Sequence, residues 1–194
     1  SPRTDDKDRS RAFFILNQRV VLTAPGVDRV MKNHEEFNQL FTYDCERAIM
    51  RDPRSWLRVT RITHHASISQ NLYFEMCSFT QDERHFVFLA QRYGGRRSPW
   101  DVMRASTDGS ELVQLTDMDS IGGVVCSPAQ NAVFYLHENT LRRVQIDTTE
   151  DEEVALVPGI GPAYSPSLAT IDAAGKLYFG TARLANGQCV LYRV

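Results

Sequence analysis

The adjacent histidines His64 and His65 are the residues in this sequence best suited to chemistry at a ligand. They lie between two strand-like runs, LRVTRIT and NLYFEMCSFT, and therefore in a connection at the end of a sheet, where ligands commonly reach a protein. Adjacent residues of an extended chain point to opposite sides, so at most one of the two imidazoles faces a given ligand. We expect this connection to be an exposed loop, with a ligand-binding site as the alternative. His85 and His137 lie in or beside strand-like runs, and we expect structural roles for them.

The cysteines Cys45, Cys77, Cys126 and Cys189 lie far apart and include no C-x-x-C pair. A zinc site needs closely spaced ligands, and a disulfide scaffold needs more cysteines in a shorter chain. The sequence therefore predicts buried free thiols in strands. It predicts no metal site and no cofactor held by residues of this chain.

Other short motifs are weaker. Gly159-Ile160-Gly161 lacks the third glycine and the following helix of a dinucleotide-binding fingerprint, and we interpret it as a turn. The sequence contains neither the G-x-S-x-G of a serine hydrolase nor the H-E-x-x-H of a zinc protease. Arg92, Arg96 and Arg97 cluster in the loop QRYGGRRSPW, which is either a solvated loop or a site for a carboxylate or a partner.

The overall composition is that of an ordinary globular protein, with 194 residues, 42% hydrophobic and 24% charged. A net charge of −2 argues against broad electrostatic binding to nucleic acid. No apolar run approaches the roughly 20 residues of a membrane helix, and no secretory signal follows Ser1. We therefore expect no membrane or nucleic-acid partner and a cytoplasmic location, with the periplasm as the alternative.

The elements that would position these residues fall into two parts. Residues 1–56 are expected to form an N-terminal strand and helix segment. Within it, 12–23 has the composition of a strand, 27–40 has helical spacing of apolar residues, and 44–51 is expected to be a short helix that ends at Asp52-Pro53. From about residue 57 onward the sequence consists of short strand-like runs separated by turn residues.

A repeat of about 45 residues organises this second part. Three segments combine a strand containing Ser or Thr, a polar turn and an aromatic strand, and Phe88, Phe134 and Phe179 in their aromatic strands lie 46 and 45 residues apart. Four strands in each such repeat are typical of a β-propeller blade. We therefore predict a mainly β protein whose blades span 64–117, 118–158 and 162–194, with these phenylalanines at equivalent buried positions. A β-sandwich is the alternative.

The predicted third blade stops inside its third strand, so residues 57–194 amount to about two and a half blades of a partial propeller. A propeller usually closes with 4 to 8 blades, and closure protects the strand edges. We therefore expect the chain to be a fragment of a larger propeller. We also expect self-association through the incomplete blade.

The run VTRITHHASISQNLYFEMCSFTQDERHFVFLAQR, followed by ELVQLTD, GGVVCSP, AVFYL and LRRVQID, resembles the oligogalacturonate lyase family. The resemblance implies a seven-bladed propeller that cleaves short, pectin-derived galacturonate oligomers by β-elimination, with a histidine as base and a manganese ion at the acid group. It also implies that the base and the metal ligands come from later blades, beyond Val194. No catalytic residue is therefore assigned within this chain, and an acidic oligosaccharide is the implied partner.

The substrate-binding candidates are His64, His65, Gln70 and Asn71. The family's first inner strand usually opens with a His-Arg pair, where this chain has Gln70-Asn71, and this difference leaves other functions open. One alternative is a non-catalytic binding or scaffold propeller of the Tol-Pal type. Another is the propeller cap of a peptidase, which requires a downstream hydrolase domain.

Overall fold

The computed structural model describes residues 42–43, 45–65, 68–91, 99–158, 168–184 and 187–194. Within these ranges the chain consists of antiparallel β-sheets and one 3-10 turn, η1 (Pro128–Gln130). The prediction of a mainly β, partial propeller is thereby confirmed. The strand expected within 12–23 and the helix expected within 27–40 lie outside the described residues.

The first sheet has the strand order β1-β7-β6-β5-β4, and all its pairs are antiparallel. Its strands are β1 (Thr42–Tyr43), β4 (Ile68–Asn71), β5 (His85–Gln91), β6 (Asp101–Ser106) and β7 (Leu112–Gln114). Strands β4 to β7 follow one another in the sheet as they do in the sequence, which is the meander expected of a blade. Strand β1 adds a fifth, outer strand beside β7.

The second sheet has the order β11-β10-β9-β8 and the third the order β12-β13-β14. The strands of the second sheet are β8 (Gly122–Ser127), β9 (Ala132–His137), β10 (Thr140–Gln145) and β11 (Asp151–Leu156). Those of the third are β12 (Ala169–Ile171), β13 (Tyr178–Arg183) and β14 (Cys189–Arg193). The third sheet therefore has the first three strands of the pattern, as its sequence predicts.

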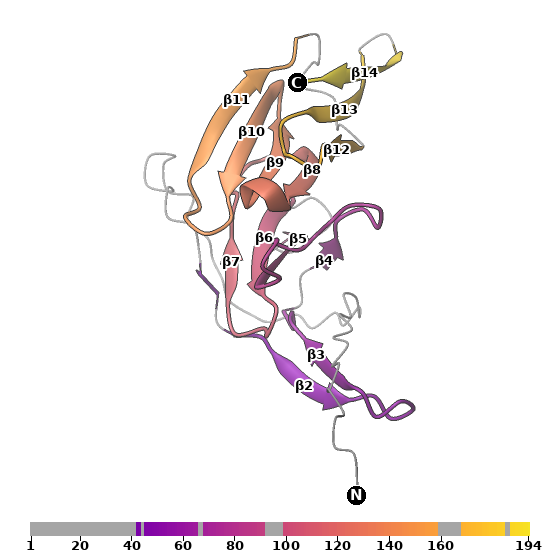
Figure 1. Cartoon of the computed structure of the whole chain (residues 1–194), viewed down its shortest axis with the longest axis vertical. Helices are drawn as coiled ribbons and strands as arrows, with labels where there is room; N and C mark the ends of the chain where they lie inside the picture. Colours follow the sequence, from indigo (N-terminus) through magenta and orange to yellow (C-terminus); the bar gives the residue numbers. More distant parts are fainter. Residues whose placement is uncertain (1–41, 44, 66–67, 92–98, 159–167, 185–186) are drawn as a thin grey trace, which may run out of the picture.

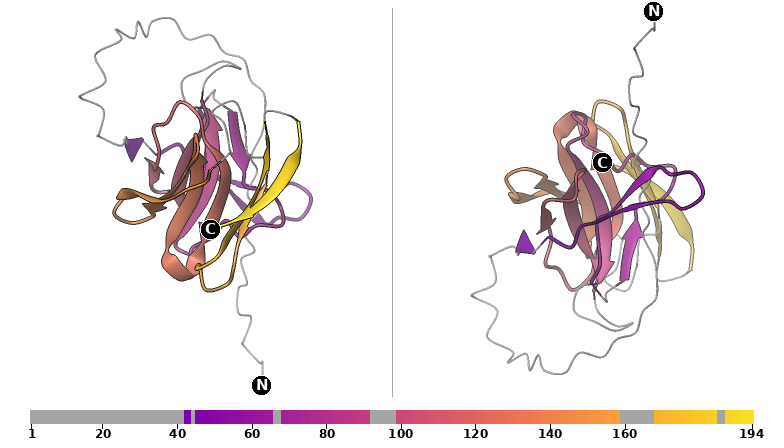
Figure 2. Two further views of the ribbon diagram at one scale, coloured as in Figure 1. Left: turned by 90° about the horizontal axis from the view of Figure 1, so that it is seen from above. Right: turned by 90° about the horizontal axis from the view of Figure 1, so that it is seen from below.

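The three sheets stack along the long axis, with the first strands β4, β8 and β12 on one side and the outer strands β7 and β11 on the other (Figure 1). Seen from above, the third sheet (yellow) lies to one side of the other two (Figure 2). One apolar cluster, which includes Val87, Val102 and Tyr135, joins the first and second sheets. Another, which includes Phe134, Leu136 and Tyr178, joins the second and third.

Strand β9 shows why its sequence is apolar at consecutive positions. Val133 and Tyr135 belong to the cluster shared with the first sheet, whereas Phe134 and Leu136 belong to the cluster shared with the third. A strand covered on both faces needs apolar side chains on both, so hydrophobic and polar residues do not alternate along it.

The three phenylalanines that mark the repeat all lie in second strands, but their predicted equivalence is wrong for one of them. In each sheet, one residue pair closes the turn before the second strand: Thr80 and His85, Ser127 and Ala132, and Asp172 and Leu177. Counted from these pairs, Val87 is the equivalent of Phe134 and Phe179, and Phe88 lies one residue further, on the opposite face. Phe88 and Phe134 are buried, whereas Phe179 is half-buried.

A tyrosine and a glycine fix the contact between the second and third sheets. The Tyr178 hydroxyl donates a hydrogen bond to the Gly123 carbonyl oxygen at 2.7 Å. Gly123 has φ +56°, and a Cβ at this position would lie 2.3 Å from the Tyr178 hydroxyl oxygen. Glycine is therefore needed here both for its backbone conformation and for the close approach of the tyrosine.

The short helix expected over 44–51 is wrong. Strand β2 (Ala48–Arg51) instead pairs antiparallel with β3 (Arg58–Arg61), and the pair forms a two-stranded sheet (Figure 1). A helix of two turns cannot repay the cost of nucleation without a face to bury, whereas the run Arg58–Arg61 offers a complete strand partner. The tip of this hairpin exposes Trp56, which is 71% accessible and has φ +60°.

The chain around this hairpin also packs against the first sheet. The Tyr43 hydroxyl donates to Gln114 Oε1 at 2.9 Å, the Cys45 thiol donates to the Gly109 carbonyl oxygen, and Arg47 Nη1 donates to the Asp108 carbonyl oxygen. Tyr43 and Ile62 belong to the apolar cluster on the face of the first sheet that points away from the second. This segment therefore helps to cover that face.

Candidate functional site

The connection between β3 and β4 carries His64 and His65, and both are exposed. Glu46 Oε2 accepts hydrogen bonds from the backbone N–H groups of His64, at 2.7 Å, and His65, at 2.9 Å. The adjacent N–H groups therefore hold a carboxylate that belongs to the chain itself. The arrangement shows that this turn is suited to a carboxylate, and that a ligand carboxylate would have to use the histidine side chains or displace Glu46.

The other two sequence candidates lie on β4, the first strand of its sheet. Gln70 pairs with Leu89 and Asn71 pairs with Phe88, and both side chains are exposed. The Asn71 side-chain oxygen accepts a hydrogen bond from the Ser78 hydroxyl at 3.2 Å, so it is already used within the sheet. The four candidates thus lie in the β3–β4 connection and on β4 itself, and the Gln70 side chain is exposed; their role in binding stays a prediction.

A pocket of about 380 Å³ lies next to this strand, between the segment after β4 and the third sheet. Tyr73, Glu75 and Met76 line one side of it, and strands β12, β13 and β14 line the other. Glu75 is the one charged residue among these lining residues. A negatively charged ligand is therefore disfavoured in this pocket, which the sequence analysis did not identify.

A group of buried polar side chains lies within the first sheet, where β6 begins and β7 ends. Asp101, Gln114 and Thr116 are each at most 1% accessible. The Thr116 hydroxyl accepts a hydrogen bond from the Val102 N–H at 2.9 Å, and Gln114 Nε2 donates to the Thr116 carbonyl oxygen at 2.7 Å. Neither carboxyl oxygen of Asp101 has a hydrogen-bond partner.

Burial raises the pKa of Asp101 to about 7, and the nearby charge of Asp117 acts in the same direction. This is a titratable group of the kind found at functional sites, although structural carboxyl groups show the same behaviour. The sequence analysis missed it. The signal available in the sequence was an aspartate directly before the apolar pair Val102-Met103, at the start of a strand that is covered on both faces.

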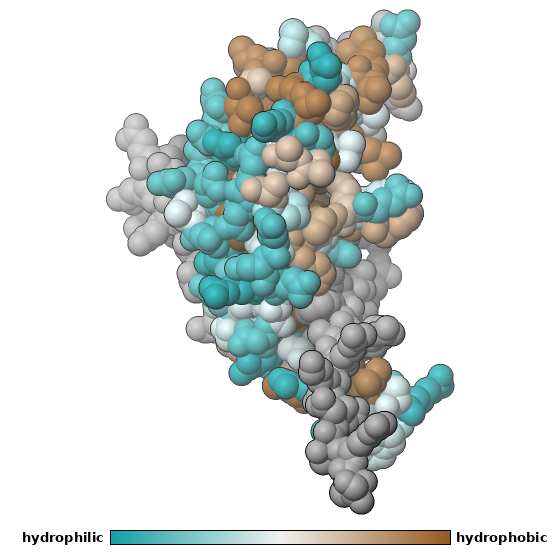
Figure 3. Space-filling view, viewed as in Figure 1, coloured by the Kyte–Doolittle hydropathy of each residue, from teal (hydrophilic) through white to brown (hydrophobic). Residues whose placement is uncertain are grey.

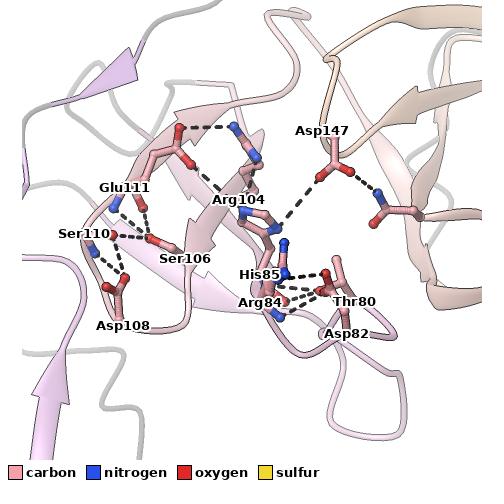
Figure 4. A network of polar contacts seen from close by, with 11 residues as sticks. Thr80, Asp82, Arg84, His85, Arg104, Ser106, Asp108, Ser110, Glu111 and Asp147 are labelled. Atoms are coloured by element: carbon pink, nitrogen blue, oxygen red, sulfur yellow. Dashed lines mark hydrogen bonds and ion pairs between the residues drawn. The ribbon is translucent and has the colours of Figure 1, made fainter.

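His85 takes part in a polar network that joins the first and second sheets (Figure 4). Arg104 Nη2 donates to Glu111 Oε1 at 3.3 Å, and Arg104 Nη1 lies 3.3 Å from His85 Nε2. His85 Nδ1 lies 3.9 Å from Asp147 Oδ1, and Asn131 Nδ2 donates to Asp147 Oδ2 at 2.7 Å. The network connects two adjacent sheets, which agrees with the structural role expected for His85.

The prediction of four buried thiols is wrong for three of them. Cys126 on β8 is buried, but Cys45, Cys77 and Cys189 are exposed, and all four are free. Cys45 and Cys77 lie outside the strands. Cys189 is the first residue of β14, which is an edge strand because it pairs only with β13. Its side chain is exposed to solvent.

Across the described ranges no three His, Cys, Asp or Glu side chains gather closely enough to hold a metal ion. The donor set that manganese requires is therefore not assembled by this part of the chain. Nor does any helix within the same ranges have the length and apolar character needed to cross a membrane.

No protein-family model matches the sequence, and no curated protein matches it significantly. Solved structures do match, and two of them are oligogalacturonate lyases. Oligogalacturonate lyase from Vibrio parahaemolyticus is 19% identical, with a TM-score of 0.64, and an oligogalacturonate lyase in complex with manganese is 20% identical, with a TM-score of 0.65. Each match covers 80% of this chain and 46% of the other. The chain therefore has the fold of part of an oligogalacturonate lyase and spans about half the length of these proteins.

Proposed function

We propose that this chain forms part of a larger propeller that cleaves short galacturonate oligomers by β-elimination. The observation that carries the proposal is the match of 80% of the chain to the fold of two oligogalacturonate lyases. The sequence resemblance over residues 57–158 points to the same family. The role proposed for this part of the protein is to bind and orient the sugar acid.

β-Elimination removes the proton α to the uronate carboxylate and expels the glycosidic oxygen from the neighbouring carbon. The reaction needs a base and a group that stabilises the negative charge that develops on the carboxylate. Under this proposal, Gln70 offers its carboxamide to sugar hydroxyl groups, and one of the two histidines, His64 or His65, offers its imidazole to a carboxylate. The pocket beside Glu75 is not assigned to the uronate, because its charge has the wrong sign.

Manganese would supply a charge at the uronate carboxylate when it is bound. The described residues do not assemble a site for this metal ion. The proposal assigns the metal ligands and the base to residues outside the described ranges.

The test compares the 194-residue chain with the longest protein that the same reading frame encodes. Each is incubated with digalacturonate and Mn²⁺, and the unsaturated uronate product is followed by its absorbance. We expect product from the longer protein and none from the 194-residue chain. In the longer protein, Gln70→Ala should raise KM for digalacturonate several-fold, whereas the matched control Gln81→Ala, at an exposed turn residue, should leave it unchanged.

A longer protein that binds trigalacturonate in calorimetry but yields no unsaturated product would refute the lyase proposal and favour the non-catalytic binding propeller. The neutral trisaccharide maltotriose is the control for binding. Binding of both sugars with equal affinity would also contradict the proposal, because a uronate site must distinguish the carboxylates.

A further inference from the structure

Two cysteine sulfur atoms, one in the β4–β5 connection and one on β8, lie near the same backbone oxygen. Cys77 Sγ lies 3.4 Å from the carbonyl oxygen of Phe79, and Cys126 Sγ lies 3.9 Å from the same oxygen. The two sulfur atoms are therefore no farther apart than the sum of these distances. The charge of a Cys77 thiolate also raises the pKa of Cys126, which agrees with this proximity.

The backbone around the two cysteines allows them to come closer. Cys126 is held in β8, whereas Cys77 lies between β4 and β5, outside both strands, and its side chain is exposed. A disulfide needs the two sulfur atoms about 2.05 Å apart and the Cα atoms within about 6.8 Å. The bond would require a rotation of the Cys77 side chain and a shift of its connection, which lies outside the two strands.

We propose that Cys77 and Cys126 form a reversible disulfide that links the first and second sheets when the chain meets a peroxide. In the first step the Cys77 thiol releases its proton, the thiolate attacks a peroxide oxygen and the O–O bond breaks; Cys77 sulfenic acid and hydroxide result, and the hydroxide takes up the released proton as water. In the second step the Cys126 sulfur displaces hydroxide from that sulfenic acid, and the Cys126 proton leaves with it as water. Two thiols and one hydrogen peroxide thus give one disulfide and two water molecules.

The order of the steps follows from exposure. Cys77 is open to solvent, whereas Cys126 is 2% accessible, and burial raises the pKa of its thiol to about 12. A buried thiol of this kind is a poor target for a dissolved oxidant but is well placed to trap a sulfenic acid beside it. The bond would also fix the segment Tyr73–Met76, which lines the pocket next to the third sheet.

The test uses the chain with Cys45→Ser and Cys189→Ser, which removes the other two exposed thiols and leaves Cys77 and Cys126. After reduction, the folded protein is treated with hydrogen peroxide, and free thiols and intact mass are measured. We expect the thiol count to fall from two to zero in a monomer that is lighter by the mass of two hydrogen atoms. A tryptic peptide pair joining Cys77 to Cys126 should appear and should disappear with dithiothreitol.

Two further variants serve as controls. In the background that lacks Cys45 and Cys189, Cys77→Ser should leave Cys126 reduced after the same treatment, because no exposed thiol starts the reaction. Cys126→Ala should instead leave Cys77 as its sulfenic or sulfinic acid. The proposal is overturned if the chain with both cysteines gains oxygen mass on Cys77 while Cys126 stays free, or if it forms only dimers linked through Cys77.

Discussion

Replacing Asp101 by asparagine is expected to remove a large part of the pH dependence of the chain's stability. The Asp101 carboxyl is fully buried and lacks hydrogen-bond partners, and burial raises its pKa from 3.8 to about 7. The folded chain therefore keeps a proton on Asp101 at pH values where the unfolded chain has released it. Stability from this group is present at low pH and is lost as pH rises towards 7.

The size of the effect follows from the two pKa values. Between pH 5 and pH 7 the unfolded chain carries an ionised Asp101 and the folded chain a neutral one. Each pH unit in this interval costs about 1.4 kcal/mol of unfolding free energy. Over the interval from pH 5 to pH 8 the group therefore lowers the stability by about 3 kcal/mol, because its titration in the folded chain is nearly complete at pH 8.

The assay is urea unfolding at pH 5 and pH 8, followed by tryptophan fluorescence. Trp100 is half-buried next to Asp101 and should report unfolding, whereas Trp56 is already exposed in the folded chain. Asp101→Asn should be more stable than the unchanged chain at pH 8 and equal or slightly less stable at pH 5. Glu150→Gln, at an exposed acidic residue, is the matched control and should keep the original pH dependence.

Comparing variants in this way removes every contribution to the pH dependence that the compared chains share. The aspartates Asp52, Asp82, Asp108 and Asp172 have lowered pKa values, so they stay ionised throughout. Parallel stability curves for the unchanged chain and Asp101→Asn would refute the reasoning, since they would show that Asp101 ionises equally in both states.

Three other perturbations test the packing. Gly123→Ala should lower the free energy of unfolding in urea by about 2 to 4 kcal/mol, because the added Cβ would clash with the Tyr178 hydroxyl. The control Gly187→Ala, which also has a positive φ but has open space around it, should lower it by only about 1 kcal/mol. Equal losses would contradict the close contact between Gly123 and Tyr178. Tyr135→Phe should cost about 1 to 3 kcal/mol, because the hydroxyl donates to Asp151 Oδ2 at 2.6 Å; an unchanged unfolding midpoint would argue against this bond. Leu191→Lys should reduce self-association measured by light scattering, because this apolar side chain is 74% exposed on β14. If the unchanged chain and the variant are both monomeric, the expectation is wrong.

The apolar surface behind the last expectation lies at the end of the molecule where β11 and β14 meet solvent. Brown, hydrophobic atoms gather there, and hydrophilic atoms cover the face below them (Figure 3). Leu156 on β11 is 70% exposed and Leu191 on β14 is 74% exposed. Large exposed apolar residues at a sheet edge favour contact with another chain, so we propose self-association through this end.

The repeat made the sheets predictable, but it could not fix the register. Turn residues and strand-forming runs recur along the chain, and the structure has strands at those runs. The run around Phe88 is apolar at consecutive positions because both faces are covered, so the sequence contains no alternation that would distinguish Val87 from Phe88. The spacing of phenylalanines was therefore an unreliable guide at the level of a single residue.

The candidate site was predictable in part. His64 and His65 were chosen for their place between two strand-like runs, and Gln70 and Asn71 for their position in the family resemblance; the structure puts the first pair in the β3–β4 connection and the second on β4, and their role in binding stays a prediction. The buried Asp101 was not identified, because it is covered by β7, which includes Gln114 and follows Asp101 in the sequence. The approach of Cys77 to Cys126 likewise depends on the stacking of two sheets, which no local pattern encodes.

The register of β14 has a consequence for amide hydrogen exchange. Tyr178 and Val194 exchange both backbone hydrogen bonds, and the pairing continues residue by residue from there. In an antiparallel pair the N–H groups of alternate residues point toward the partner, so those of Val190, Tyr192 and Val194 face β13. Those of Cys189, Leu191 and Arg193 face the edge where no described strand pairs with β14. Deuterium should therefore enter β14 at every second residue, and slowing at Leu191 and Arg193 alone would locate whatever comes to occupy that edge.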